Sequence, residues 1–194
     1  MIYFTSDLHL GHQTVLKNRP QFRDTDEMKT TIIANINSIV KPSDTLYILG
    51  DLAFRIPVDE ANDLIRQING KKILIRGNHD KDYDESLFEF IKDYDTLKIN
   101  KKKYIMMHYP ITYWAQMKYG SIQLHGHLHS APDYNDRNHE IGRLQYDVGV
   151  DAHDFRPVSI DEIEAWADSS PWMDYREREH HADRIEERGR YEPE

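Results

Sequence analysis

Five short apolar segments of this chain each run directly into a cluster of histidine, aspartate or asparagine side chains. The segments are rich in β-branched, aromatic and aliphatic residues, a composition typical of buried strands. The clusters that follow them are Asp7-Leu8-His9, Gly50-Asp51, Gly77-Asn78-His79-Asp80, His108 and Gly126-His127-Leu128-His129. Ligands of open α/β sheets bind beyond the carboxyl ends of the strands. We therefore expect the five clusters, although far apart in the chain, to meet at one edge of the fold.

The first half of the chain alternates between strand and helix patterns. Its expected elements are buried strands over 2–5, 45–49 and 73–75, and helices with one apolar face over 25–40 and from Pro57 to the closing Gly70. Asp24 and Glu27 resemble a capping box at the start of the first helix. Strand and helix in regular alternation predict a parallel α/β arrangement.

The second half of the chain is predicted to be mostly extended. Its expected elements are a hairpin of 96–99 with 104–108, strands over 121–124 and 144–148, and a closing helix around 160–166. From Asp168 onward the composition becomes strongly charged. We therefore expect one domain over residues 1–167, followed by an exposed tail over 168–194 that is either helical or disordered.

Composition limits the chemistry that this chain can carry. Its 194 residues include 11 His and no Cys, and the formal net charge is −9. Without Cys there is no disulfide, thiolate zinc finger, iron–sulfur cluster or Cys nucleophile. The acidic balance argues against a protein that coats nucleic acid, but bound cations could still supply the positive charge that a phosphate ester needs. No membrane span or signal peptide is predicted, so we expect a cytoplasmic protein.

The residue types in the five clusters suit hard or borderline divalent cations. Carboxylate oxygen and neutral imidazole bind manganese, iron, zinc or nickel. At a spacing of two, Asp7 and His9 can face the same way, and so can His127 and His129. Two cations a few Å apart need a shared carboxylate, for which Asp51 is the natural candidate.

Each cluster taken alone also has a purely structural interpretation. Gly-Asp and Gly-Asn-His-Asp after a strand are ordinary polar turn sequences, and a lone His is often a satisfied core or surface residue. What favours a common site is that all five clusters occur in this order, each at the end of a strand.

In this order the clusters resemble the motifs of the calcineurin-like metallophosphoesterases, and the resemblance covers residues 1 to about 130. The segment from 146 to 159 also looks like the end of small bacterial and phage members of that family. The resemblance implies an α/β fold of two packed mixed β-sheets flanked by helices, a four-layer sandwich. It also implies two divalent transition metal ions, with manganese favoured and iron, zinc or nickel as alternatives.

The resemblance further implies a role for each matching residue. One metal would be held by Asp7, His9 and His129, the second by Asn78, His108 and His127, and Asp51 would bridge the two. His79 would be the general acid near the leaving-group oxygen, and Asn78 would also contact the substrate. A metal-bridging hydroxide would attack phosphorus in line, without a covalent enzyme intermediate.

One departure from the family pattern bears on the substrate. Protein-phosphatase members continue Gly-Asp-x-x-Asp-Arg-Gly, whereas Phe54 stands here where they carry the Asp that orients the general acid. This argues against a phosphoprotein phosphatase. Asp80 could replace the missing orienting group. Arg55 keeps the Arg position and either contacts the substrate phosphate or is a plain surface residue.

Several residues near these motifs have both a functional and a structural interpretation. His12 and Arg19 either line the substrate cleft or lie on the surface. His125 is either a supporting or a structural residue, and His153 could approach the site from the last loop. The aromatic residues within 109–114 either form an apolar wall for an aromatic leaving group or pack their own loop.

The expected function is that of a dinuclear metal-dependent phosphoesterase. Its substrate would be a phosphodiester or a small phosphomonoester, a nucleotide included, with no membrane partner. A nuclease is the first alternative, although it would need a basic, aromatic groove. A non-catalytic scaffold of the same fold is the second, although such a protein would show eroded ligand positions. Metal identity and oligomeric state are left open by the sequence.

Overall fold

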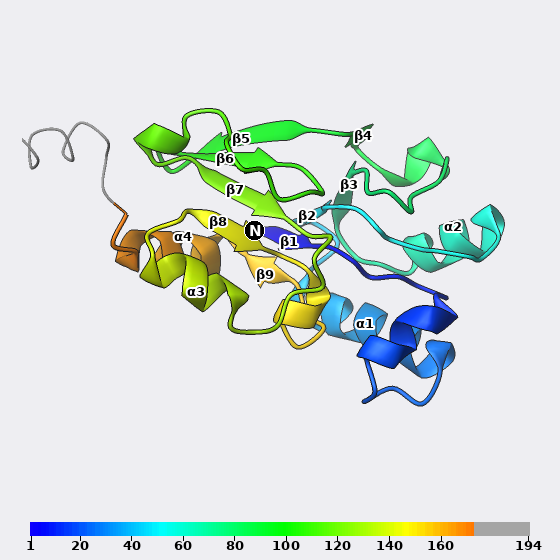
Figure 1. Cartoon of the computed structure of the whole chain (residues 1–194). Coiled ribbons are helices and arrows are strands. Elements are labelled where there is room, and N and C mark those ends of the chain that lie inside the picture. The colour runs from blue at the N-terminus through cyan, green and yellow to red at the C-terminus, as the bar shows by residue number, and fades with distance from the viewer. Residues whose placement is uncertain (173–194) are drawn as a thin grey trace, which may run out of the picture.

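The computed structural model describes residues 1–172, which form two mixed β-sheets that pack face to face with helices outside them (Figure 1). The first sheet has the order β4-β3-β2-β1-β9. Its strands are β1 (Ile2–Thr5), β2 (Thr45–Ile48), β3 (Lys71–Ile75), β4 (Phe90–Lys92) and β9 (Val158–Ser159). The first four are parallel, and β9 runs antiparallel to β1.

The second sheet has the order β5-β6-β7-β8. Its strands are β5 (Asp95–Ile99), β6 (Lys102–Met106), β7 (Ile122–His125) and β8 (Gln145–Asp147). The first pair is an antiparallel hairpin, and β6, β7 and β8 are parallel to one another. The expected fold class, two packed mixed sheets flanked by helices, is confirmed.

The described residues also form four α-helices and four short 3-10 helices. The α-helices are α1 (Thr25–Ile39), α2 (Val58–Arg66), α3 (Tyr134–Glu140) and α4 (Ile160–Ser169). The 3-10 helices are η1 (Gln13–Asn18), η2 (Glu85–Leu87), η3 (Met117–Tyr119) and η4 (Val150–Ala152). No helix in the described part of the chain is both long and apolar enough to cross a bilayer.

Alternate residues of the central strands contribute to two apolar layers. Tyr47 of β2 and Ile73 of β3 face the second sheet, where they share a buried cluster with Tyr104. Leu46 and Leu74, one position away on the same two strands, belong to the cluster that includes the apolar faces of α1 and α2. This alternation is the period-two geometry of a strand that is buried on both faces. The packing of these two apolar layers fixes the positions of the strands and of their carboxyl ends.

Helix ends show where local sequence signals hold. Asp24 caps α1 by accepting a hydrogen bond from the Glu27 backbone at 2.8 Å, as expected. The reciprocal half of the predicted capping box differs, because the Glu27 carboxylate accepts from the Arg23 backbone instead. A complete capping box occurs at α4, between Ser159 and Glu162. Pro57 lies at the N-cap of α2, one position before the first helical turn.

Three elements were not predicted from the sequence: β4, β9 and α3. The last of these has no apolar stripe and is held by polar side chains. Asn135 and Asn138 donate to the backbone carbonyls of Asp147 and Gln145, at 2.9 and 2.8 Å. The tail predicted from residue 168 begins inside α4, because that helix continues to Ser169. Residues 173–194 of the predicted tail lie outside the described residues.

Two isoleucines test the packing between the sheets. Ile122 on β7 is 1% exposed, whereas Ile141 after α3 is 73% exposed. We expect Ile122→Ala to lower the free energy of unfolding by about 2–5 kcal/mol, because it removes buried methyl groups and leaves a cavity. Ile141→Ala should change it by less than about 0.5 kcal/mol. Urea unfolding of both variants measures the difference, and equal effects would contradict this account of the core.

Candidate metal centre

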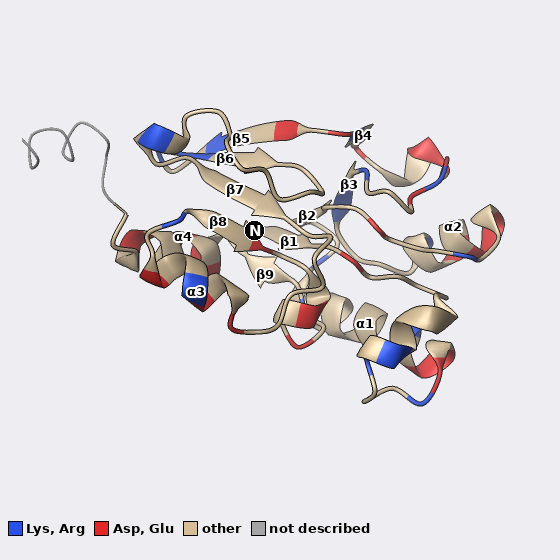
Figure 2. Cartoon of the chain, in the orientation of Figure 1, with Lys and Arg blue, Asp and Glu red and all other residues tan. Residues whose placement is uncertain are grey.

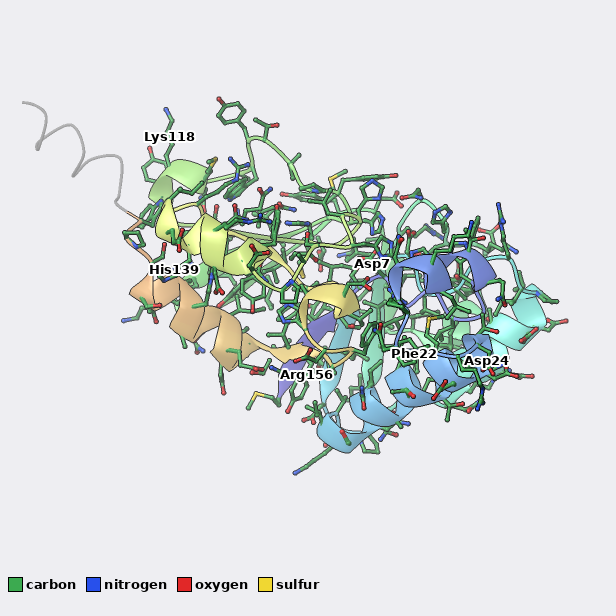
Figure 3. All side chains as sticks on the ribbon, turned by 60° about the horizontal axis from the view of Figure 1, so that its bottom comes forward. Asp7, Phe22, Asp24, Lys118, His139 and Arg156 are labelled. Atoms are coloured by element: carbon green, nitrogen blue, oxygen red, sulfur yellow. The ribbon has the colours of Figure 1, made fainter. Side chains whose placement is uncertain are left out.

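The loops that follow β1, β2, β3, β6 and β7 meet at one edge of the sandwich, as the strand-end clusters predict. Two groups of side chains form there. One consists of Asp7, His9 and His129, and the other of Asp51, His108 and His127. Within each group the ligand atoms lie within 4.8 Å of one another, so each group could hold a metal ion. Figure 3 shows Asp7 near the middle of the molecule, well apart from Lys118 at its far end.

Asp51 lies between the two groups. Its Oδ2 is 3.5 Å from Nε2 of His9 and 3.6 Å from Nε2 of His108. Asn78, from the loop after β3, places its Oδ1 3.2 Å from Nε2 of His108. A carboxylate that faces both groups is what a pair of neighbouring cations requires.

Five of these residues have a left-handed backbone, with φ of 58° at Asp7, 49° at His9, 54° at Asp51, 72° at His127 and 48° at His129. Asp and His tolerate this region better than most residues, although it still costs free energy. The prediction from strand alternation was therefore wrong in its reason: Asp7 and His9 converge because their loop turns sharply, not because they continue β1.

Glycines make room for these turns. A Cβ on Gly126 would overlap Oγ of Ser6 and the carboxylate of Asp7. A Cβ on Gly77 would overlap the carboxylate of Asp51. In both places the backbone of one loop passes directly against a candidate ligand from another loop, so only glycine fits.

Backbone groups hold the candidate ligands in place. Oδ2 of Asp7 accepts from the His127 backbone N–H at 2.9 Å, and Oδ1 of Asp51 accepts from the His79 backbone N–H at 2.9 Å. Nδ1 of His108 lies 2.7 Å from the carbonyl oxygen of Leu49, to which it donates. That bond leaves Nε2 of His108 as the electron-pair donor that faces Asp51.

The protonation states of Asp7 and His9 reflect their burial. Burial raises the pKa of Asp7 to about 8 and lowers the pKa of His9 to about 2, so His9 is neutral and ready to donate an electron pair. Oδ1 of Asp7 is buried and has no hydrogen-bond partner. A buried, unpartnered carboxylate oxygen beside the neutral imidazole of His9 is an environment that a divalent cation would satisfy. The donor set therefore fits the expected metal ions.

His79 lies beside this centre, with its side chain 32% exposed and its Nε2 3.9 Å from Oδ2 of Asp51. Its ring packs on Phe54, with the ring centroids 3.9 Å apart. Asp80 does not orient His79, which corrects that expectation. The Asp80 carboxylate instead accepts from the backbone N–H groups of Asp51 and Gly77, and so holds the loops together.

The two expected substrate contacts outside the metal groups lie next to Phe54. The His12 ring packs edge-on against Phe54, and its Nδ1 is 3.2 Å from Nδ1 of His9. Arg55 is exposed, and its guanidinium carbon lies 5.2 Å from the centre of the Phe54 ring. Both side chains therefore border the same side of the site as His79.

The structure settles the alternatives for three other residues. Arg19 is neither on the surface nor in a cleft, because it is 0% exposed. His125 is structural: its Nδ1 donates to the Gly126 carbonyl, and its Nε2 lies 3.3 Å from the Tyr134 hydroxyl. His153 does not approach the site, because its Nε2 donates to the carbonyl of Asp147.

One aromatic residue of the 109–114 loop adjoins the site. Tyr109 is 38% exposed, and its ring centroid lies 4.6 Å from that of His127. Trp114, by contrast, is buried and donates to the Ser121 carbonyl. The loop thus combines both interpretations, with Tyr109 at the site and Trp114 packing the loop.

Sequence reasoning assigned no role to Asp151, although it contacts the site. Its Oδ2 accepts from Nδ1 of His129 at 2.8 Å, and both its oxygens accept from Arg19. These bonds, which outweigh the effect of burial, lower the pKa of Asp151 to about 2. Burial disfavours the charged form of His129, but Asp151 and Asp7 outweigh it, so the pKa of His129 is raised. Arg19 and Asp151 are 132 positions apart, a separation at which no local pattern links them.

Two mixed sheets with candidate metal-binding groups of His and Asp at their shared edge make this chain an α/β sandwich protein with a candidate metal centre. Within that class, this chain belongs to the calcineurin-like phosphoesterase family, whose model matches residues 1–185. The resemblance seen in the sequence motifs is thereby confirmed.

The chain is also similar over most of its length to three other proteins. The uncharacterized protein MJ1445 of Methanocaldococcus jannaschii is 32% identical over 167 residues, which cover 84% of this chain and 88% of the relative. The gene 66 protein of Mycobacterium phage L5 is 30% identical over 192 residues, covering 83% and 91%. The solved structure of AQ665, a protein of unknown function from Aquifex aeolicus, has a TM-score of 0.66 and 30% identity and covers 85% of this chain and 98% of its own.

The buried carboxyl of Asp7 gives a test of the centre without metal. Because its folded pKa of about 8 lies above the usual 3.8, the folded protein keeps a proton that the unfolded chain releases. Stability contributed by this group is therefore lost as pH rises from about 4 towards 8. In chelator, we compare the free energy of unfolding of the unmodified protein with that of Asp7→Asn. We expect the first, relative to the second, to fall from pH 5 to pH 8.

Urea unfolding at each pH measures this difference. Asp82→Asn, at an exposed position, serves as the matched control and should show a constant difference from the unmodified protein. A cation that holds the Asp7 carboxylate ionised should stabilise the protein more at pH 8 than at pH 5. A difference between the protein and Asp7→Asn that does not vary with pH would contradict this description of the centre.

Proposed function

We propose that this protein is a dinuclear metal-dependent phosphoesterase that hydrolyses phosphodiesters or small phosphomonoesters. The observation that carries the proposal is the position of the Asp51 carboxylate between two groups of His and Asp side chains. Family membership supplies the reaction class, and this geometry supports two neighbouring cations rather than one.

Seven side chains would hold the metal ions. The first ion would be held by Asp7, His9 and His129, the second by Asn78, His108 and His127, with Asp51 shared between them. When bound, such a pair lowers the pKa of a water and neutralises charge on the phosphoryl oxygens. Oxygen and nitrogen donors suit manganese, iron, zinc and nickel, and the resemblance to the family favours manganese among them.

His79 is the proposed general acid for the leaving-group oxygen. Its side chain is partly exposed beside Asp51, so it can reach a substrate bound at the edge. Its ring packs on Phe54, and the Asp80 carboxylate does not orient it. Arg55 and His12, which border the same side, would bind phosphoryl oxygens of the substrate together with the Asn78 amide.

The surroundings of the centre favour a small substrate over a long nucleic acid. Exposed Tyr109 lies beside His127, and Phe54 lies beside His79, so an apolar or aromatic group could pack on either side of the phosphate. In the described part of the chain, Lys and Arg are scattered among acidic residues along the ribbon and form no continuous stripe (Figure 2). A backbone-tracking groove for single strands needs such a stripe.

The variant Asp51→Asn tests the proposal. Metal-stripped protein is refilled with manganese, nickel, zinc or magnesium and assayed on a chromogenic monoester, a chromogenic diester, cyclic nucleotides and single-stranded nucleic acid. We expect metal-dependent hydrolysis of the small esters by the unmodified protein. Asp51→Asn should lose the paired binding of two ions and at least about 100-fold in activity, because the shared carboxylate is gone.

The control for this experiment is Asp82→Asn, which changes an exposed carboxylate and should keep full activity. Full activity of Asp51→Asn would disprove the two-metal mechanism. No metal-dependent turnover on any substrate would favour a non-catalytic scaffold, and turnover of nucleic acid alone would favour a nuclease.

His79→Ala separates acid catalysis from metal binding. We expect its metal content to match that of the unmodified protein, because His79 lies outside both candidate metal groups. Hydrolysis should slow by about 100-fold or more for poor leaving groups, and less for a nitrophenolate, which departs without a proton. Steady-state rates on a series of aryl and alkyl esters measure this, and an equal loss on every ester would rule out His79 as the acid.

A further inference from the structure

Arg19 is a large, fully buried side chain, and four of its five hydrogen bonds lead to the candidate metal centre or to the residue that supports it. The fifth runs from Nη1 to the sulfur of Met28, and the guanidinium carbon lies 5.4 Å from the centre of the Phe155 ring. Arg19 follows η1 directly in the chain and is 0% exposed. Nε and Nη2 donate to the two carboxylate oxygens of Asp151, at 2.8 and 2.7 Å. Nη2 also donates to the backbone carbonyl of Asp7 at 2.6 Å, and Nη1 to that of Leu8 at 3.1 Å.

Asp151, in η4, connects Arg19 to a candidate metal ligand. Its Oδ2 accepts from Nδ1 of His129 at 2.8 Å. A carboxylate accepts only, so Nδ1 of His129 carries the hydrogen, and in the neutral ring Nε2 presents its electron pair. That Nε2 lies 3.1 Å from Nε2 of His9, inside the group that also contains Asp7.

The guanidinium therefore acts on one metal group from two sides. Through the carbonyls of Asp7 and Leu8 it holds the sharp loop that carries two members of the group, and through Asp151 it orients the third, His129. In the described part of the chain, neither Arg19 nor Asp151 forms a hydrogen bond with the other group, which consists of Asp51, His108 and His127.

We propose that Arg19 and Asp151 are positioning residues for one metal ion only, the ion held by Asp7, His9 and His129. This inference rests on the proposed function, because it takes the two groups to be metal sites. A carboxylate that receives the second N–H of a ligating imidazole fixes the tautomer and the direction of the ring, and its loss lowers metal affinity by about 10–100-fold. Arg19 extends that support to the loop that carries Asp7 and His9. Its planar guanidinium donates several hydrogen bonds in fixed directions, which the ammonium group of lysine cannot do.

A purely structural role would give a different pattern. A buried ion pair that only stabilised the fold would, when weakened, reduce the binding of both ions or of neither. Positioning predicts a selective loss, because the interactions end on one group. The readout is therefore the affinity of each site for metal, and not only the activity of the loaded protein.

The test uses three variants of the full chain. Asp151→Asn keeps the shape of the side chain but removes its charge. Arg19→Lys keeps the positive charge but removes the planar guanidinium. His129→Ala identifies which step of metal binding belongs to the group of Asp7, His9 and His129. Metal-stripped proteins are titrated with Co²⁺ by calorimetry and by visible absorption, and bound metal per chain is measured by elemental analysis. Ile122→Ala, which is expected to lower stability from the amino end of β7, the end away from His127 and His129, is the control for general destabilisation.

We expect Asp151→Asn and Arg19→Lys to weaken the step that His129→Ala abolishes by about 10–100-fold, and to leave the other step unchanged. Excess metal should then restore the activity of both variants. Equal weakening of both steps, or no weakening in Asp151→Asn, would overturn the inference even where hydrolysis is metal-dependent. A wild-type titration without any Co²⁺ binding would overturn the inference and the proposed function together. If Arg19→Lys fails to fold, the Co²⁺ titration of the isosteric variant Asp151→Asn still tests the inference.

Discussion

The hydrogen bond from the His127 backbone to the Asp7 carboxylate, at 2.9 Å, joins a loop of the second sheet to a loop of the first. The arrangement of the site depends on this contact between sheets. Each candidate metal group draws on both sheets: His129 completes a group that begins with Asp7, and Asp51 completes a group with His108 and His127. Neither sheet alone carries a complete group, so the apolar packing between them sets the geometry of the chemistry.

The centre is built at the expense of local stability. Five candidate ligands have a left-handed backbone, and Oδ1 of Asp7 is buried without a partner. Such features persist only where the surrounding fold determines them, and here the two apolar clusters and the buried Arg19 do so. Strain and an unsatisfied oxygen at the same edge are what a preorganised cation site would show before it is loaded.

The sequence predicted most of the strands and the meeting of the strand-end clusters, because both follow from local patterns, whereas the pairing of two sheets was implied by the family resemblance. Short, nearly continuous apolar runs identify strands that are buried on both faces, and the carboxyl ends of parallel strands lie together. Interactions between distant residues were not visible in this way. The link between Arg19 and Asp151 spans 132 positions, and the direction of the Asp80 carboxylate depends on loops that no propensity describes. The polar helix α3 was missed because asparagine side chains, not an apolar stripe, hold it.

The place of β9 in the first sheet affects the order in which the site can mature. β9 pairs with β1, the first strand made, and Asp151 precedes β9 by only a few residues. A nascent chain that has just passed His129 already carries every candidate ligand, yet it lacks β9, one of the two partners of β1, and the carboxylate that accepts the His129 hydrogen bond. Because chains emerge from the ribosome amino end first, the centre assembles only when nearly the whole domain has been synthesised. Termination between His129 and β9 yields a chain with all of its candidate ligands and an unfinished site.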